Sequence, residues 1–242
     1  MRLRLLVIVP VLVLGIFGCG GSGSGGSTNE QFFYRFTNII PFISGVDFLV
    51  DKQVQVPNLQ YAGHTDYFET DTEEPNMFID AVDSVTQEII DAIVITKRRD
   101  ASVHIYALGV RGGPQQQQPE AQIIPIEVIR TTPQGNARLI VVHGYVRRAG
   151  TQTPNIDLLR SGQIQPIVED MPFANAETVN VPPGTYTLTA RFAGLLSGEF
   201  LFRRNVELLA GHVYVALLRG VEGQAGALEP IIDIFEEPVF DP

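Results

Sequence analysis

The sequence contains one cysteine and no tryptophan among its 242 residues. With a single cysteine no disulfide can form within the chain, so packing must hold its domains together. Only 17 Lys and Arg residues stand against 27 Asp and Glu residues. This acidic balance opposes binding to nucleic-acid backbones, which depends on Lys and Arg. The composition therefore excludes a disulfide-stapled scaffold and argues against a nucleic-acid partner.

Motifs that carry catalysis are also scarce. The four histidines, His64, His104, His143 and His212, show no spacing typical of metal ligands. The body of the chain has no Gly-x-Ser-x-Gly nucleophile motif, and no glycine-rich phosphate loop follows a strand-like run. We therefore expect no enzymatic activity, no cofactor and no metal site.

The N-terminus has the layout of an export signal. Arg2 and Arg4 precede an uncharged, mainly aliphatic run from Leu5 to Gly18. This run is shorter than the roughly 20 residues that a helix needs to cross a bilayer. A short apolar run behind a basic start is typical of a signal peptide. The sequence predicts that residues 1–18 are a cleavable signal peptide.

The signal ends at Cys19, the only cysteine. The preceding residues Ile16-Phe17-Gly18 resemble the lipobox of bacterial lipoproteins, in which an aliphatic and a small residue precede a lipidated cysteine. Exported chains otherwise use cysteines in pairs, so a lone cysteine here indicates lipidation. Two or three acyl chains on Cys19 would anchor the protein stably to a membrane. The alternative is an ordinary secretory signal with a chance cysteine.

The residues after the cysteine indicate the localisation of the protein and form a linker. Gly20 differs from the Asp that retains many lipoproteins in the inner membrane, which indicates the outer membrane or cell surface in a Gram-negative host. The segment 20–28 is Gly and Ser except for Thr28, a composition typical of flexible linkers. We therefore assign residues 19–29 to a lipidated cysteine with a Gly/Ser linker.

Beyond residue 30 the sequence has an all-β rhythm. Short runs rich in Val, Ile, Phe, Tyr and Thr alternate with Gly, Pro and Asn clusters at intervals of about ten residues. Val46–Val50 and Thr185–Thr189 alternate between two faces, and the β-branched stretch Val85–Ile95 is also predicted as a strand.

An internal repeat organises this body. Four short matches recur in the same order, about 110 residues apart: Val46–Leu49 with Ile156–Leu159, Val56–Ala62 with Val168–Ala174, Ala101–Ile105 with Gly211–Val215, and Pro125-Ile126 with Pro230-Ile231. The repeat predicts a first domain at 30–130, a linker at 131–136 and a second domain at 137–242. Repeats of about 100 residues with about seven short strands fit immunoglobulin-like β-sandwiches.

Turn chemistry distinguishes the two repeats. Pro182-Pro183-Gly184 in the second repeat predicts a type II turn with a positive φ at Gly184. The first repeat has a longer polar loop, Asp71–Asn76, at the corresponding place.

Several segments of the second repeat resemble the bacterial family called domain of unknown function 4397. They are Arg138 with Val142-His143-Gly144, Ile156-Asp157-Leu158, Pro183–Leu188 and Leu209–Tyr214. The first repeat follows through Arg35, Val46-Asp47-Phe48 and Leu59, but has Asn38 where the family has His. The resemblance implies tandem immunoglobulin-like domains on secreted or surface proteins, often lipoproteins, without an assigned activity or catalytic residues.

Two clusters in the first repeat have two interpretations each. The first cluster is a run of carboxylates that could gather around Ca²⁺ or form a solvated loop. The loop is favoured, because the spacing typical of a calcium loop is missing. The carboxylates are Asp66, Glu69, Asp71, Glu73, Glu74, Asp80 and Asp83. The aromatic residues Phe32, Phe33, Tyr34 and Phe36 could form a binding platform, but at a first strand core packing is favoured.

The sequence thus predicts a membrane-anchored cell-envelope protein that serves as a non-catalytic structural or binding module for an unknown protein or glycan. Binding is expected in the polar loops that differ between the repeats: Asp71–Asn76, Gly112–Glu120 and Tyr145–Asn155. The alternative is a carbohydrate-binding accessory protein. The missing tryptophan counts against it, because sugars are usually met by broad aromatic surfaces.

Overall fold

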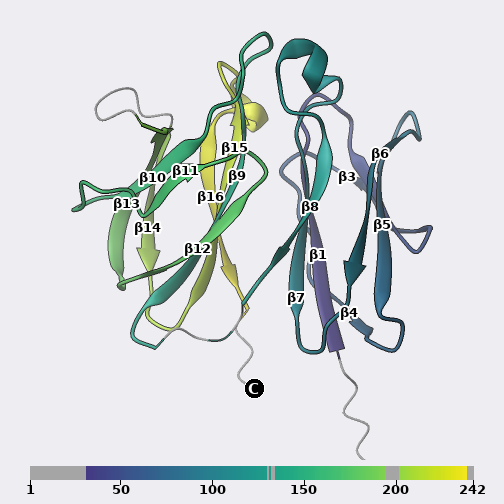
Figure 1. Ribbon diagram of the computed structural model, residues 1–242, viewed down its shortest axis with the longest axis horizontal. Helices are drawn as coiled ribbons and strands as arrows, with labels where there is room; N and C mark the ends of the chain where they lie inside the picture. Colours follow the sequence, from purple (N-terminus) through teal and green to yellow (C-terminus); the bar gives the residue numbers. More distant parts are fainter. Residues whose placement is uncertain (1–30, 130, 132–133, 195–201, 239–242) are drawn as a thin grey trace, which may run out of the picture.

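A computed structural model describes residues 31–129, 131, 134–194 and 202–238. These residues form four sheets of four strands each, arranged as two β-sandwiches side by side (Figure 1). This is the all-β, two-domain architecture that the sequence predicts. The signal peptide, Cys19 and the Gly/Ser linker lie outside the described residues. No helix in the described ranges is long and apolar enough to cross a membrane.

The first sandwich contains eight described strands, where about seven were expected. They are β1 (Gln31–Ile39), β2 (Val46–Val50), β3 (Gln53–Leu59), β4 (Phe68–Asp71), β5 (Asn76–Asp83), β6 (Ile89–Thr96), β7 (Ser102–Leu108) and β8 (Gln122–Glu127), with the 3-10 helix η1 (Gly113–Gln116) before β8. One sheet has the order β4-β1-β7-β8 and the other β3-β2-β5-β6. The strand expected over Val85–Ile95 begins only at Ile89, because the preceding residues form the turn from β5.

The second sandwich repeats this topology strand for strand. Its elements are β9 (Ala137–Val146), β10 (Ile156–Arg160), β11 (Val168–Met171), β12 (Ala176–Val181), β13 (Gly184–Phe192), β14 (Phe202–Leu208), β15 (Val213–Val221), η2 (Gly226–Leu228) and β16 (Ile231–Glu237). The sheets are β12-β9-β15-β16 and β11-β10-β13-β14. Gly184 at the start of β13 has a φ of 153°, which is positive but not the value near 80° of the expected type II turn.

Alternating side chains build each sandwich core. In β5, Met77, Ile79 and Ala81 point inward and are buried, while Phe78 between them is exposed. Phe32, Tyr34 and Phe36 of β1 lie in the same core, which confirms the packing role expected for these three. Phe33 lies outside this core and is half-buried.

The first two sequence matches of the repeat are structurally equivalent positions. Asn58 and Asp170 both adopt a positive φ, 47° and 54°. Their backbone N–H groups donate to equivalent carboxylates, Asp47 Oδ1 at 2.6 Å and Asp157 Oδ1 at 3.0 Å. The same side chain therefore fixes the same turn in both domains.

The third and fourth matches are wrong in register. Val103 and Ile105 of β7 face their core, and in β15 this role falls to Tyr214 and Ala216, one residue later than matched. A one-residue slip exchanges the two faces of a strand, so burial decides the alignment.

The proline match is displaced further. Ile105 pairs with Pro125, whereas its counterpart Ala216 pairs with Ile234. Pro230 lies before β16, whereas Pro125 lies within β8, so the two prolines do not correspond. A two-residue match of proline and an aliphatic residue carries too little information to fix a register.

The β4-β1-β7-β8 and β12-β9-β15-β16 sheets face each other across the domain interface (Figure 1). A third apolar cluster joins the domains; its buried members are Ile39, Tyr106, Leu108, Val128, Ile140, Val142, Val213, Val215 and Leu217. Both faces of β7 are therefore covered, and all seven of its residues are buried. The two sandwiches share a core and are not merely joined by a linker.

Candidate functional site

Four equivalent loops gather at one end of the molecule. Strand β1 is parallel to β7, and β9 is parallel to β15. Both pairs run toward the same end of the molecule (Figure 1). The loops that follow them lie together at the top of Figure 1, two from each domain. The described chain begins at Gln31, at the opposite end of β1.

A cleft of about 380 Å³ lies between these loops. Both domains line it, the first through Pro41, Phe42, Ile43, Val110, Arg111, Gln116 and Gln118, and the second through Arg148, Ala149, Val221 and Gln224. Buried Val110 and Val221 provide apolar surface, while planar amide and guanidinium groups provide hydrogen-bonding capacity. Its volume lies at the lower end of the ~300–1,000 Å³ typical of small-ligand sites.

The structure brings together two of the three loops in which binding was expected. Gly112–Glu120 supplies Gln116 and Gln118, and Tyr145–Asn155 supplies Arg148 and Ala149. The third loop, Asp71–Asn76, follows β4 at the other end of the first domain and takes no part (Figure 1).

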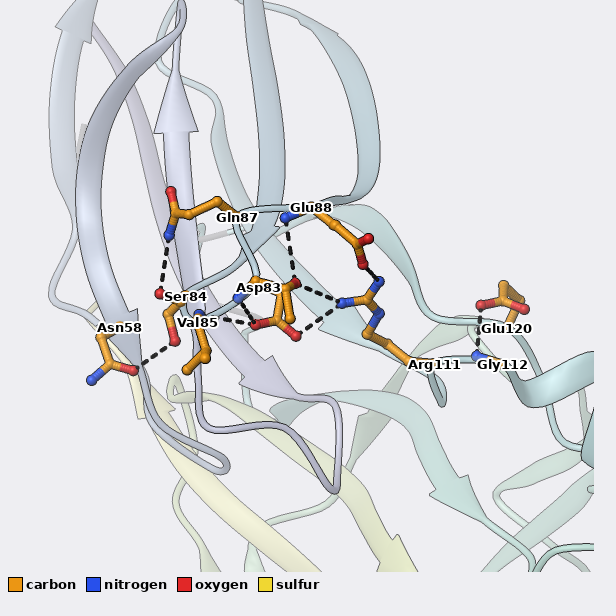
Figure 2. Close-up of polar contacts among 10 residues, drawn as sticks. Asn58, Asp83, Ser84, Val85, Gln87, Glu88, Arg111, Gly112 and Glu120 are labelled. Carbon is orange, nitrogen blue, oxygen red and sulfur yellow. Dashed lines mark hydrogen bonds and ion pairs between the residues drawn. The ribbon is translucent and has the colours of Figure 1, made fainter.

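Arg111 is held rigidly in the first domain. Its Nη1 donates to Asp83 Oδ2 at 2.9 Å and its Nη2 to Glu88 Oε2 at 2.7 Å (Figure 2). The N–H groups of Val85 and Thr86 also donate to Asp83, at 2.9 and 3.0 Å. The hydrogen bond from the Thr86 N–H contributes most to lowering the pKa of the Asp83 carboxyl. Together with Val85 and Arg111 it outweighs burial, which acts to raise that pKa. This carboxylate therefore stays ionised and fixes the guanidinium beside the cleft.

The second domain contributes a guanidinium pair. Arg147 donates two hydrogen bonds to the Glu222 carboxylate, at 3.2 and 3.1 Å, and the Arg148 side chain lies 3.8 Å from the same carboxylate. Burial acts to raise the pKa of Glu222, but the hydrogen bonds from Arg147 and the Arg148 backbone outweigh it and lower that pKa. The Arg148 side chain remains 73 % exposed.

Two hydrogen bonds tie the walls of the cleft together. Gly150 N donates to Gln116 O at 2.7 Å, and Gln118 Nε2 donates to Arg147 O at 2.5 Å. Because both bonds cross from one domain to the other, the cleft exists only when the domains are docked.

Phe42 lines the cleft, and no sequence pattern pointed to it. It is 60 % exposed and has a φ of 65°. A positive φ after a proline is the arrangement of a type II turn, in which Gly or Asn normally occupies this position. A bulky residue there is a conformational outlier, and the cost is usually compensated elsewhere or by function.

Two carboxylates of the acidic stretch in the first domain are engaged by cationic side chains. Asp80 binds Lys52 Nζ at 3.0 and 2.8 Å, and Asp83 binds Arg111. Within the described ranges, no group of three or more His, Cys, Asp or Glu side chains is placed to hold a metal ion.

A second polar cluster is buried between the domains. Arg35 Nη2 donates to Glu237 Oε1, and Tyr67 OH donates to Glu237 Oε2 at 2.7 Å. Arg35 Nε donates to His104 Nδ1 at 3.1 Å. A guanidinium has no acceptor, so Nδ1 has no proton and His104 Nε2–H donates to Thr37 Oγ1 at 2.6 Å.

The charge state of this cluster follows from its surroundings. Complete burial, with the positive charge of Arg35 beside it, holds the pKa of His104 well below its usual value. His104 is therefore neutral, and the 4.0 Å between its Nδ1 and Glu237 is no ion pair. The cluster is enclosed and satisfied, which fits a role in docking the domains.

Comparison with known proteins adds no assignment: no family model and no curated protein sequence matches this chain. The resemblance to domain of unknown function 4397 rests on the motifs quoted above.

Proposed function

We propose that the protein is a lipid-anchored, non-catalytic binding module of the bacterial cell envelope, and that the cleft between the domains is its binding site. The observation that carries this proposal is the position of the cleft. It lies at the end of the molecule opposite Gln31, where the N-terminal segment joins the first domain.

The distance between these ends supports a role in presentation. Strand β1 has nine residues, so at about 3.3 Å per residue its two ends are ~30 Å apart. An anchor at Cys19 would hold the Gln31 end near the membrane and direct the cleft away from it. The linker over 20–28 would let the cleft reach partners in the surrounding space.

The chemistry of the cleft supports binding over catalysis. The charged residues that line it are Arg111 and Arg148, which lie beside Asp83 and Glu222, and the pKa values of these two carboxylates are lowered. Such carboxylates exchange no proton near neutral pH, as a general acid or base must. The resemblance to domain of unknown function 4397 points the same way.

The anchor is tested by changing its cysteine. Cys19→Ala should abolish incorporation of a labelled fatty acid and release the protein from the membrane fraction, because no thioether can form. Unchanged labelling of this variant would refute the lipid anchor.

The binding role is tested by capture from native envelope with the full chain. Arg148→Gln, which removes an exposed cleft charge, should reduce captured material. Arg98→Gln is the matched control, since Arg98 is 61 % exposed and follows β6 at the end away from the cleft. Equal capture by both variants would contradict the cleft as the binding site.

A further inference from the structure

The cleft carries features that narrow the class of its ligand. The first is the ring of Phe42 at its edge. This large apolar ring is 60 % exposed, and its residue is held in a sterically disfavoured turn. Aromatic rings supply broad apolar contact at a low cost in side-chain entropy. The missing tryptophan is therefore no obstacle to an aromatic contact surface.

The second feature is the planar polar groups that line the same cleft. Gln116 and Gln224 can each donate and accept, and Arg148 can donate several hydrogen bonds. Hydroxyl groups also donate and accept, so neighbouring hydroxyls on one molecule match such groups. The Arg148 guanidinium lies 3.8 Å from Glu222 and is otherwise largely exposed.

The third feature is the balance of charge. Arg111 faces Asp83 and Glu88, while Arg147 and Arg148 share Glu222. The two charged residues that line the cleft, Arg111 and Arg148, thus each have a carboxylate beside them that offsets their charge. Since the whole chain is acidic, with a formal net charge of −10, a polyanionic ligand would also meet long-range repulsion. These charges favour an uncharged ligand.

From these features we propose that the cleft binds a neutral saccharide, with one sugar ring against Phe42 and its hydroxyls bonded by Arg148 and the glutamines. This inference rests on the proposed function and names its ligand class. An open cleft of about 380 Å³ suits the end of an oligosaccharide. A ligand with one apolar face and a hydroxylated edge uses both the ring and the planar groups.

The test measures binding of the full chain in detergent to immobilised oligosaccharides. Neutral probes are maltotetraose, cellotetraose, mannotriose and chitotriose, and charged probes are sialyllactose and oligogalacturonate. At least one neutral probe should bind, and the charged probes should bind more weakly. Binding to charged probes alone would overturn the proposal.

The ring is tested by Phe42→Asn, because Asn tolerates a positive φ and should leave the turn intact. Losing the ring should weaken binding of the neutral probe about tenfold or more. The matched control is Phe78→Thr on the outer face of β5, where Phe78 is 50 % exposed and far from the cleft. Equal affinities of the two variants would overturn the proposal.

A second variant protects the test against misfolding. Arg148→Gln keeps a planar donor but removes charge, so it should weaken neutral-probe binding only several-fold, whereas Arg148→Ala should weaken it further. If no saccharide binds while Arg148→Gln still loses captured envelope material, the saccharide is wrong and the binding role stands. If neither effect is seen, both proposals fail.

Discussion

Arg35 and Glu237, 202 residues apart in the chain, form an ion pair that is buried between the two domains. Their equivalents in the other domain are apolar. Tyr34 and Phe36 face the first core as Leu139 and Val141 face the second, so Arg35 corresponds to Ile140. By the register of the last strands, Glu237 corresponds to Val128, and both apolar residues lie in the interdomain cluster.

This relation predicts that a single substitution lowers the stability and that a matched paired substitution restores most of it. Glu237→Ala should lower the free energy of unfolding by about 3–5 kcal/mol, because it leaves a buried guanidinium without its counter-charge. Arg35→Ile with Glu237→Val, which copies the apolar pair, should recover most of this loss. The hydroxyl of Tyr67 would still lack its acceptor. Urea denaturation of the three proteins measures the effect, and a double variant as unstable as Glu237→Ala would contradict it.

The strands and the tandem sandwiches followed from sequence because they depend on local patterns and on a repeat of those patterns. Alternation in β5 and turn residues between runs are readable one segment at a time. Two of the three variable loops meet at the cleft for a topological reason, since both follow strands that end on the same side.

The domain interface could not be predicted, because it depends on which strands are covered on both faces. The double burial of Ser102–Leu108 was hidden, because its polar Ser102, His104 and Tyr106 alternate with apolar residues although all seven are buried. Such alternation is typical of a strand with one face toward solvent. Arg35 and Glu237 gave no signal at all, since a charged residue in a strand usually faces solvent. Phe42 was equally hidden, because its strain is a property of the backbone.

A second prediction concerns Ile39 and its structural equivalent Gly144. A Cβ on Gly144 would lie 2.2 Å from Ile39 Cδ1, so the glycine makes room for the isoleucine across the interface. Gly144→Ala should cost about 1–3 kcal/mol through overpacking. Ile39→Ala should cost ~2–5 kcal/mol through the cavity it leaves.

The pair should be coupled. In the double variant the new methyl group at 144 enters the space vacated at 39, so the combined loss should be smaller than the sum of the single losses. Chemical denaturation of the four proteins gives this coupling energy. Additive losses would show that the two residues do not meet and that the domains dock otherwise.

A third prediction concerns the carboxylates between Asp66 and Asp83. Asp80 and Asp83 are engaged by Lys52 and Arg111, so Ca²⁺ would have to displace these cations to bind there. The melting temperature should therefore be the same in EDTA and in excess Ca²⁺, because only a ligand bound to the folded state raises stability. A calorimetric shift of several degrees with Ca²⁺ would refute this.

The last prediction concerns His143, which is buried in the second domain. Its Nε2 lies 3.3 Å from the Pro154 carbonyl oxygen, and its Nδ1 is buried without a hydrogen-bond partner among the described residues. Burial lowers the pKa of His143 from 6.5 to about 4 in the folded protein, although the Pro154 bond acts in the other direction. The folded protein therefore keeps this histidine neutral at pH values where the unfolded chain protonates it.

The sign follows from proton uptake. Between pH 6.5 and about 4 the unfolded chain binds the proton more readily, so the free energy of unfolding falls as the pH falls through this window. From pH 7 to pH 5 the contribution of His143 amounts to a loss of about 2 kcal/mol. Other titrating groups add their own pH dependence, so the informative quantity is the difference from a variant that lacks this one histidine.

The matched variant is His143→Asn, because Asn38 fills the equivalent position of the first domain. There its Nδ2 donates to Leu59 O at 2.8 Å and its Oδ1 accepts from Ile40 N at 2.9 Å. Urea denaturation of both proteins at pH 8 gives the packing difference alone, since the histidine is neutral in both states. Between pH 7 and pH 5 the wild-type protein should lose about 2 kcal/mol more than the variant. Parallel pH profiles would mean that His143 has the same pKa in the folded and unfolded states, and they would contradict the prediction.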